Sequence, residues 1–314
     1  MANNKNHFQF NNIPDLSGKV AIITGGSAGI GESCAFQIAR KNCTVILGCR
    51  NKSKGELVVK KIQEETGNNN VECILLDLND LKSIKSFAEM FLSKYDQLHI
   101  LINNAGLMPN GGLERSKDGF EIMFATNVIG THYLTVQLLP ILEKSMPSRI
   151  VNVASSFYII TKFVKTSVEI LNDEDYYNRF LQYGRTKAII MLLTFELDRR
   201  LRAKGVNNLY VNTNDPGPVK TQAYYKRVNK GSVMDKFISL VFAAADEGSL
   251  TQLYLATSPE VEEQNIHGEY YTPIAKRDKV KSDYTKSEKE AEKAWSAVEK
   301  LIKEKIPDYP GANI

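Results

Sequence analysis

Short apolar runs alternate along this chain with longer stretches of helical periodicity. The short runs are rich in β-branched residues and are continuous rather than alternating, as in strands that are covered on both faces. Strand and helix in regular alternation imply parallel strands joined by right-handed crossovers, so the pattern predicts an α/β fold with a doubly wound parallel sheet. The predicted strands are 19–24, 44–48, 71–76, 98–103, 149–154 and 209–213, and the predicted helices are 30–41, 52–65, 82–94, 120–143 and 183–204.

No internal repeat and no Pro- or Gly-rich linker divides this pattern, so we predict one domain over residues 18–275. A polar extension, 1–17, precedes the domain, and a charged tail, 276–314, follows it. The insertion 157–177 joins the apolar stretch FYIITKF to the acidic NDEDYY, and its apolar part either faces a substrate or packs on the insertion itself. Apolar residues at helical spacing in the tail predict a helix docked on the domain rather than a partner-binding helix; they are Trp295, Val298, Leu301 and Ile302.

Composition and charge narrow the class of protein. The 314 residues are 43% hydrophobic and 24% charged, which is the balance of a folded globular protein, and a net charge of +4 gives no support to nucleic acid as a partner. The four cysteines form no C-x-x-C pair and the four histidines show no ligand spacing, so we expect no metal site. No run approaches the roughly 18 apolar residues of a membrane span. We therefore expect a cytoplasmic protein with no membrane span.

The stretch TGGSAGIG, residues 24–31, follows the first predicted strand directly and opens the first predicted helix. Glycines permit a tight turn and let the backbone approach a pyrophosphate, while the helix N-terminus supplies unpaired N–H groups. A glycine pattern alone is weak evidence, but the strand before it and the helix after it are what dinucleotide binding requires. The spacing T-G-x-x-x-G-x-G therefore predicts a nucleotide site rather than a plain glycine-rich turn.

The stretch YGRTK places Tyr183 and Lys187 four residues apart in a predicted helix. Positions i and i+4 lie on one helix face, so a phenol and an ammonium can act there on the same small object. Taken by itself, such a pair is more often a tyrosine packed on the core beside a solvated lysine. The motifs that accompany the pair decide between the two readings.

Several of these motifs occur in the order found in one protein family. The glycine loop, NNAG, TNVIGTHYLT, RIVNVASS, YGRTK and DPGPVKT together resemble the short-chain dehydrogenase/reductase family, in particular its retinol-dehydrogenase-like branch and fungal alcohol dehydrogenase-like members. The resemblance runs from about Leu16 to about Tyr271. It implies a Rossmann-type doubly wound sheet in a single domain, to which this chain adds a C-terminal helical extension. It also implies hydride transfer between a nicotinamide cofactor and an alcohol or carbonyl group.

The resemblance further implies a catalytic set, which is Asn127, Ser155, Tyr183 and Lys187, with Ser156 as the alternative serine. Tyr183 would donate a proton to a carbonyl oxygen or remove one from an alcohol. A phenol has a pKa near about 10, so it acts as a base at neutral pH only if its anion is stabilised, as Lys187 and an oxidised nicotinamide would do. Ser155 would hold the substrate oxygen, and Asn127 would hold a water of the proton relay.

The residues that would hold the cofactor follow from the same resemblance. The glycine loop would line the diphosphate, Asp77 would contact the adenine, and Lys187 would bind the nicotinamide ribose. The turn after the sixth strand would contact the nicotinamide. The full set is Thr24, Gly25, Ser27, Gly29, Ile30, Gly31, Arg50, Asp77, Asn104, Ala105, Gly106, Lys187, Pro216, Gly217, Val219 and Thr221.

The end of the second predicted strand bears on the choice between NAD(H) and NADP(H). Relatives that prefer NAD place an acid there for the ribose diol, whereas this chain has Cys49 followed by Arg50. A guanidinium can pair with a 2′-phosphate, which an acid would repel. We therefore favour NADP(H) over NAD(H), although Ala28 stands where some NADP(H) enzymes have a second basic residue.

Together the motifs predict an NADP(H)-dependent oxidoreductase that interconverts a hydrophobic alcohol and its aldehyde or ketone. Apolar and aromatic residues in the insertion and in the stretch after Thr221 favour a hydrophobic small-molecule substrate over a sugar. A non-catalytic NADP(H)-binding sensor or scaffold is the alternative, although such a protein would not need all four catalytic residues. Family members are often dimers or tetramers built on the two long helices around Asn127 and Tyr183, which leaves a homo-oligomer as an option.

Overall fold

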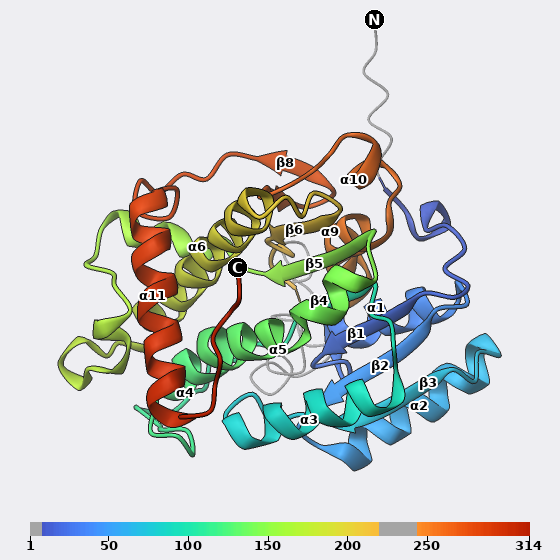
Figure 1. Cartoon of the computed structure of the whole chain (residues 1–314), viewed down its shortest axis with the longest axis horizontal. Coiled ribbons are helices and arrows are strands. Elements are labelled where there is room, and N and C mark those ends of the chain that lie inside the picture. The colour runs from blue at the N-terminus through green and yellow to red at the C-terminus, as the bar shows by residue number, and fades with distance from the viewer. Residues whose placement is uncertain (1–7, 220–243) are drawn as a thin grey trace, which may run out of the picture.

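A computed structural model of the chain describes residues 8–219 and 244–314. One sheet forms its centre, in the order β3-β2-β1-β4-β5-β6-β7-β8, and every neighbouring pair is parallel except the last (Figure 1). The predicted doubly wound parallel sheet is confirmed, and the structure adds β7 and β8, which the hydrophobic pattern did not reveal. The strands are β1 (Val20–Thr24), β2 (Thr44–Cys49), β3 (Val71–Leu75), β4 (Ile100–Asn103), β5 (Ser148–Val153), β6 (Leu209–Asn214), β7 (Tyr270–Thr272) and β8 (Lys276–Asp278).

Helices cover both faces of the sheet (Figure 1). The neighbours Ile22 and Ile23 of β1 are both fully buried, yet they belong to two separate apolar cores, one on each face. Burial on both faces is the physical reason why the strands read as continuous apolar runs. One face carries α1 (Gly29–Ala39), α2 (Lys52–Thr66) and α9 (Ala245–Thr257), with α10 (Glu260–Glu263) beyond it, and the other carries α3 (Leu81–Lys94), α5 (Thr131–Lys144) and α6 (Arg179–Ala203).

The helix predicted over 120–143 is not continuous. It consists of α4 (Ile122–Phe124), the π-helical segment η2 (Ala125–Gly130) and α5. A Cβ on Gly130 would stand only 2.3 Å from the Leu78 carbonyl oxygen, so the chain here packs directly on the backbone that follows β3. A π segment inside a helix is rare and often marks a functional site.

The helix that carries the YGRTK stretch begins earlier than predicted. Asn178 caps α6, and its side chain accepts hydrogen bonds from the backbone N–H groups of Phe180 and Leu181. Such a cap satisfies N–H groups that have no partner within the helix. Tyr183 therefore lies one turn inside α6, on a part of the helix that is fully formed. The insertion before it contains three short 3-10 helices, η3 (Ser156–Lys162), η4 (Glu169–Asn172) and η5 (Glu174–Tyr176).

The charged tail forms α11 (Glu288–Lys305), which lies along α6 in Figure 1. Trp295 is 3% exposed, its ring packs edge-to-face on His132 of α5 at 4.6 Å, and the Arg200 guanidinium of α6 lies 4.9 Å from the Trp295 ring. The prediction of a docked C-terminal helix is thus confirmed, and this helix covers part of the outer side of α5 and α6. Among residues 8–219 and 244–314, no helix is long and apolar enough to cross a bilayer.

Candidate active site

The carboxyl ends of the parallel strands bring the candidate residues to one edge of the sheet. There β1 leads into the glycine loop and α1, β4 into residues 104–106, β5 into Ser155, and β6 into Pro216. β1 and β4 are neighbours in the sheet but not in the chain, so the order of the strands reverses between them. Open α/β sheets bind their ligands in the crevice at such a point.

Three glycines shape the loop between β1 and α1. Gly25 and Gly29 have φ values of +69° and +59°, in the left-handed region that favours glycine. A Cβ on Gly31 would stand 2.6 Å from both the Asn104 Nδ2 and the Gly25 carbonyl oxygen. Any larger residue at position 31 would therefore push the loop away from the end of β4.

The end of β4 holds this loop in place through two hydrogen bonds. The Asn104 Nδ2 donates to the Thr24 carbonyl oxygen at 3.1 Å, and the Ala105 backbone N–H donates to the Thr24 Oγ1 at 2.9 Å. Three residues of the predicted nucleotide site are thus in contact although about 80 positions separate them in the sequence.

The first turn of α1 is open to an anion. Ala28, the residue before this helix, has no side chain that can accept from the first-turn N–H groups, and a Cβ on Gly29 would meet no atom of residues 8–219 and 244–314 within 4 Å. Unpaired N–H groups and the positive end of the helix dipole favour a phosphate at such a place. The residues present therefore fit the diphosphate of a dinucleotide.

The ends of β2 and β3 lie beside the same loop. The Gly25 backbone N–H of the loop donates at 2.8 Å to the carbonyl oxygen of Gly48, the residue before Cys49, which ends β2. Arg50 follows with an exposed side chain, and Asp77, partly buried, follows the neighbouring strand β3. Arg50 and Asp77 therefore border the predicted nucleotide site from adjacent strands.

The turn after β6 and the start of α1 meet next to α9. A Cβ on Gly248 of α9 would stand 2.5 Å from the Val219 Cγ2 and 3.4 Å from the Ile30 Cδ1. Glycine in α9 thus lets Val219 and Ile30 converge from two distant parts of the chain. Gly217, with a φ of +76°, allows the turn that carries Val219 to this point, whereas Thr221 lies outside the described residues.

Tyr183 faces the end of β5 from the second turn of α6. Burial raises the pKa of Tyr183, and a hydrogen bond from the Ser155 side chain partly offsets this effect. The ring of Phe157 packs edge-to-face on the Tyr183 ring, with the centroids 5.7 Å apart. Ser156, the alternative serine, is exposed, so the geometry favours Ser155 as the partner of the phenol.

Lys187 lies one turn further along α6 and is 5% exposed. Its Nζ donates to the Val153 carbonyl oxygen at the end of β5, at 2.7 Å, and lies 5.7 Å from the centroid of the Tyr183 ring. Burial lowers the pKa of Lys187 to about 8, and the charge of Asp215 partly offsets this shift. The i, i+4 spacing therefore does bring the ammonium beside the phenol, at the end of a buried strand.

Asn127 lies in the π-helical segment, and hydrogen bonds hold both ends of its amide in place. Its Oδ1 accepts from the Leu107 backbone N–H at 2.9 Å, while its Nδ2 donates to the Leu107 carbonyl oxygen and to the Thr186 Oγ1, each at 3.1 Å. The Thr186 hydroxyl donates in turn to the Tyr183 carbonyl oxygen at 2.8 Å. The threonine that replaces the more usual serine thus links Asn127 to the turn of α6 that carries Tyr183.

Gly106 leaves space between Asn127 and Lys187. A Cβ at this position would stand 3.2 Å from the Lys187 Nζ and 3.4 Å from the Asn127 Oδ1. The last residue of the NNAG stretch therefore lies next to both polar atoms, and the four predicted catalytic residues surround the ends of β4 and β5.

The comparisons with known proteins identify the family of this chain. The profile of the family described as short chain dehydrogenase matches residues 19–230. The chain belongs to the short-chain dehydrogenase family. An uncharacterized oxidoreductase of Schizosaccharomyces pombe is 35% identical over 277 residues, which are 85% of this chain and 80% of that protein. Human retinol dehydrogenase 12 is 36% identical over 287 residues, which are 91% of this chain and 87% of that protein. This dehydrogenase thus falls in the retinol-dehydrogenase-like branch that the motifs indicated.

A solved structure supports the same fold. The crystal structure of an uncharacterized protein from Mycobacterium paratuberculosis matches this dehydrogenase with a TM-score of 0.74 at 27% identity, over 95% of this chain and 98% of that one.

Sequence reasoning missed two parts of the dehydrogenase site. The first is α9, whose Gln252 Nε2 donates to the Asn104 Oδ1 at 3.4 Å and so supports the end of β4. The second is Asp215, 6% exposed, which lies inside the quoted DPGPVKT stretch but received no role. A carboxylate placed directly before the Pro-Gly turn was the available signal for Asp215.

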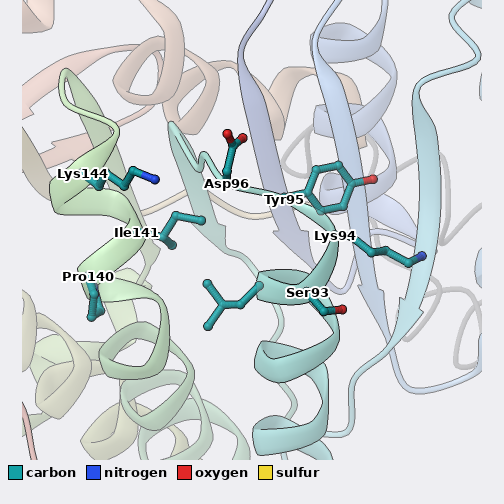
Figure 2. Close-up of a pocket in the computed structure, with 8 residues that line it drawn as sticks. Ser93, Lys94, Tyr95, Asp96, Pro140, Ile141 and Lys144 are labelled. Carbon is teal, nitrogen blue, oxygen red and sulfur yellow. The ribbon is translucent and has the colours of Figure 1, made fainter.

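A separate cavity of about 490 Å³ lies between the C-terminal ends of α3 and α5 (Figure 2). Ile141 and Lys144 extend from α5 toward it, whereas Tyr95 and Lys94 turn away and both hydrogen-bond Glu72. Helices that return between parallel strands end at the amino edge of the sheet. This cavity therefore lies at the edge opposite the catalytic residues and belongs to another surface of the dehydrogenase.

Proposed function

We propose that this dehydrogenase is an NADP(H)-dependent oxidoreductase that interconverts a hydrophobic alcohol and its aldehyde or ketone. The observation that carries the proposal is the approach of the Ser155 hydroxyl, the Tyr183 hydroxyl and the buried Lys187 ammonium at the carboxyl end of β5. These groups are a proton carrier, a hydrogen-bonding hydroxyl and a cation, which is the set that proton exchange with a carbonyl or alcohol oxygen needs.

Tyr183 is the group that exchanges the proton. Burial raises its pKa, so at neutral pH the phenol is protonated and can donate to a carbonyl oxygen. For alcohol oxidation the phenol must lose that proton, and the nearby charge of Lys187 favours the anion. The Ser155 hydroxyl holds the substrate oxygen against the phenol. When bound, the nicotinamide cofactor supplies or accepts the hydride.

The remaining site residues orient the cofactor and connect the phenol to solvent. The open first turn of α1 takes the diphosphate, and the glycine at position 106 lets the cofactor come close to Lys187. Asn127, whose amide is held by Leu107 and Thr186, positions a water of the proton relay. Each role uses an atom that the fold already holds in place, so little reorganisation is needed during the reaction.

The preference for NADP(H) rests on Arg50. Its exposed guanidinium follows Cys49 at the end of β2, beside the glycine loop, where a carboxylate would exclude a 2′-phosphate. We expect NADPH to bind more tightly than NADH and the substitution Arg50→Asp to reverse this order. Calorimetric titration of both cofactors measures the two affinities, and Lys60→Asp, on the exposed side of α2, is the control for a general loss of positive charge. Equal affinities in the unchanged protein would contradict the preference.

The hydrophobic character of the substrate is supported by two exposed rings. Phe157 and Phe180 are 48% and 52% exposed, Phe157 contacts the Tyr183 ring, and Phe180 lies three positions before Tyr183 on the same side of α6. Apolar rings left open beside a reacting group favour a ligand that covers them. One relative is named a retinol dehydrogenase, and retinol is a hydrophobic alcohol.

The test is NADPH oxidation with a panel of aliphatic, aromatic and isoprenoid aldehydes and ketones, with Tyr183→Phe measured alongside. We expect turnover to rise with the apolar area of the substrate and to fall about 100- to 10,000-fold in Tyr183→Phe, which is the range that general acid catalysis is worth. Turnover that survives in Tyr183→Phe would refute the role of the phenol. Tight NADPH binding without turnover of any substrate would refute the enzymatic proposal.

A further inference from the structure

A buried carboxylate lies next to the proposed catalytic residues. Asp215 follows β6 and is 6% exposed. Its backbone N–H donates to the Tyr271 carbonyl oxygen at 2.9 Å, and its Oδ1 accepts from the Gly217 backbone N–H at 3.0 Å. Among the described residues, no lysine, arginine or histidine forms an ion pair with it. A buried charge that is not paired is costly, so its field acts strongly on the groups around it.

The pairing of β5 with β6 places this carboxylate close to Lys187. The Lys187 Nζ is anchored on the Val153 carbonyl oxygen at 2.7 Å, and Val153 stands opposite Asn214 in the parallel register. The Ala154 backbone N–H donates to the Asn214 carbonyl oxygen at 2.7 Å, so the two strands stay in register up to this point. Asp215 is the first residue after β6, directly beyond the position that faces the anchor of Lys187.

The same carboxylate acts on the phenol and on the ammonium. Burial raises the pKa of Tyr183, and the negative charge of Asp215 raises it further. Burial lowers the pKa of Lys187, and Asp215 opposes that shift. In both cases the carboxylate favours the form that carries the proton.

Other titratable groups surround the same carboxylate. Tyr158 of η3 and Tyr270 of β7 pack edge-to-face at 5.5 Å, burial raises both pKa values, and Asp215 raises them further. Asp278 of β8 acts on these two tyrosines as well, but it is partly exposed and pairs with Lys281 at 3.7 Å. Neither the phenol of Tyr183 nor the Lys187 ammonium is among the groups whose protonation Asp278 affects.

We propose that Asp215 is a positioning residue for protons: its buried carboxylate keeps the Lys187 ammonium charged and the Tyr183 phenol protonated, which suits the centre to carbonyl reduction. The effect of Asp215 on catalysis rests on the proposed function. Its effect on the protonation of Lys187 and Tyr183 involves only side chains of this chain, so it can be measured without turnover.

The decisive variant is Asp215→Asn, because the amide oxygen can still accept from the Gly217 N–H while the charge is lost. The first measurement is the ¹³Cε titration of Lys187 in the cofactor-free protein, assigned by the loss of its signal in Lys187→Met. We expect the midpoint of Lys187, about 8 in the unchanged protein, to fall by roughly one unit in Asp215→Asn. The control Asp278→Asn leaves this midpoint in place. If Asp215→Asn does not fold, Asp215→Ser, which also offers an oxygen to Gly217, is measured instead.

The second measurement is the pH profile of kcat/KM for alcohol oxidation by the enzyme with its cofactor. Loss of the carboxylate should move both limbs of the profile to lower pH by roughly one unit, since the phenol and the ammonium each lose a proton more readily. An unchanged Lys187 midpoint, or a profile that falls in height without moving, overturns the inference and leaves Asp215 a purely structural role. An inactive enzyme whose Lys187 midpoint still falls refutes the proposed function but not the electrostatic coupling.

Discussion

The contact between α6 and η3 makes Gly184→Ala an informative perturbation. A Cβ at this position would stand 2.4 Å from the Ile160 Cγ2 and 2.6 Å from the Phe157 carbonyl oxygen. Ordinary contact begins at 3.4 Å, so the two elements must separate by about 1 Å to accept the methyl group. Because η3 begins directly after Ser155 and α6 carries Tyr183, this separation falls on the approach of the Ser155 side chain to the Tyr183 phenol.

The two consequences of this separation differ in size. Overpacking costs about 1–3 kcal/mol, and alanine recovers about 1 kcal/mol of helix propensity, so the free energy of unfolding should fall by no more than about 2 kcal/mol. A misplacement of about 1 Å at a reacting group can cost on the order of 100-fold in rate. We therefore expect kcat/KM to fall about 10- to 100-fold in a protein that is still folded at room temperature.

The assay compares kcat/KM and the midpoint of urea unfolding in Gly184→Ala with those of Gly112→Ala. Gly112 is an exposed glycine whose added Cβ would meet no atom of the described part of the chain within 4 Å, so its variant should behave as the unchanged protein. Adding Ile160→Ala to Gly184→Ala removes the closer of the two contacts and should restore part of the rate. A Gly184→Ala enzyme with unchanged kcat/KM would refute the claim that the spacing of η3 and α6 sets the position of Ser155.

Three further substitutions test other parts of the structure. Burial lowers the pKa of Lys187 from 10.5 to about 8, so burying the charged ammonium destabilises the folded state by about 3 kcal/mol. This destabilisation is complete below the pKa of the folded state, and it disappears as the pH rises to the pKa of the unfolded state. Lys187→Met should therefore abolish turnover yet raise the free energy of unfolding at neutral pH, and urea titrations should show this gain shrinking at alkaline pH; a destabilised variant at neutral pH would contradict the argument. Ile302→Ala, in the fully buried face of α11, should cost about 2–5 kcal/mol of stability in the same titrations, whereas a cost near that of an exposed site such as Leu57 would mean that α11 is not docked in solution. Thr186→Val removes the hydroxyl that accepts from the Asn127 Nδ2 and should lower kcat several-fold, while Thr186→Ser, which keeps the hydroxyl, should retain it; equal losses in both would assign the effect to packing.

Much of this fold and site could be predicted from the sequence, since the features that specify them are local. A strand buried on both faces needs a continuous apolar run, and the glycine loop has to follow such a strand directly and open a helix. The spacing of Tyr183 and Lys187 places them on one side of α6 whatever else surrounds it. Local patterns of this kind determined the doubly wound sheet, the nucleotide loop at its edge and the catalytic candidates.

Contacts between distant parts of the chain were decided only by the tertiary structure. β7 and β8 are three residues long, too short to show a pattern, and they exist because β6 offers an edge to pair with. The π segment at Asn127 follows from the packing of Gly130 on the Leu78 backbone, which helical periodicity does not encode. The place of Asp215 depends on the register of β5 with β6, because that register sets which side chain stands beyond the anchor of Lys187. Residue types along the chain therefore determined which groups are present, and long-range pairing determined which of them share an electric field.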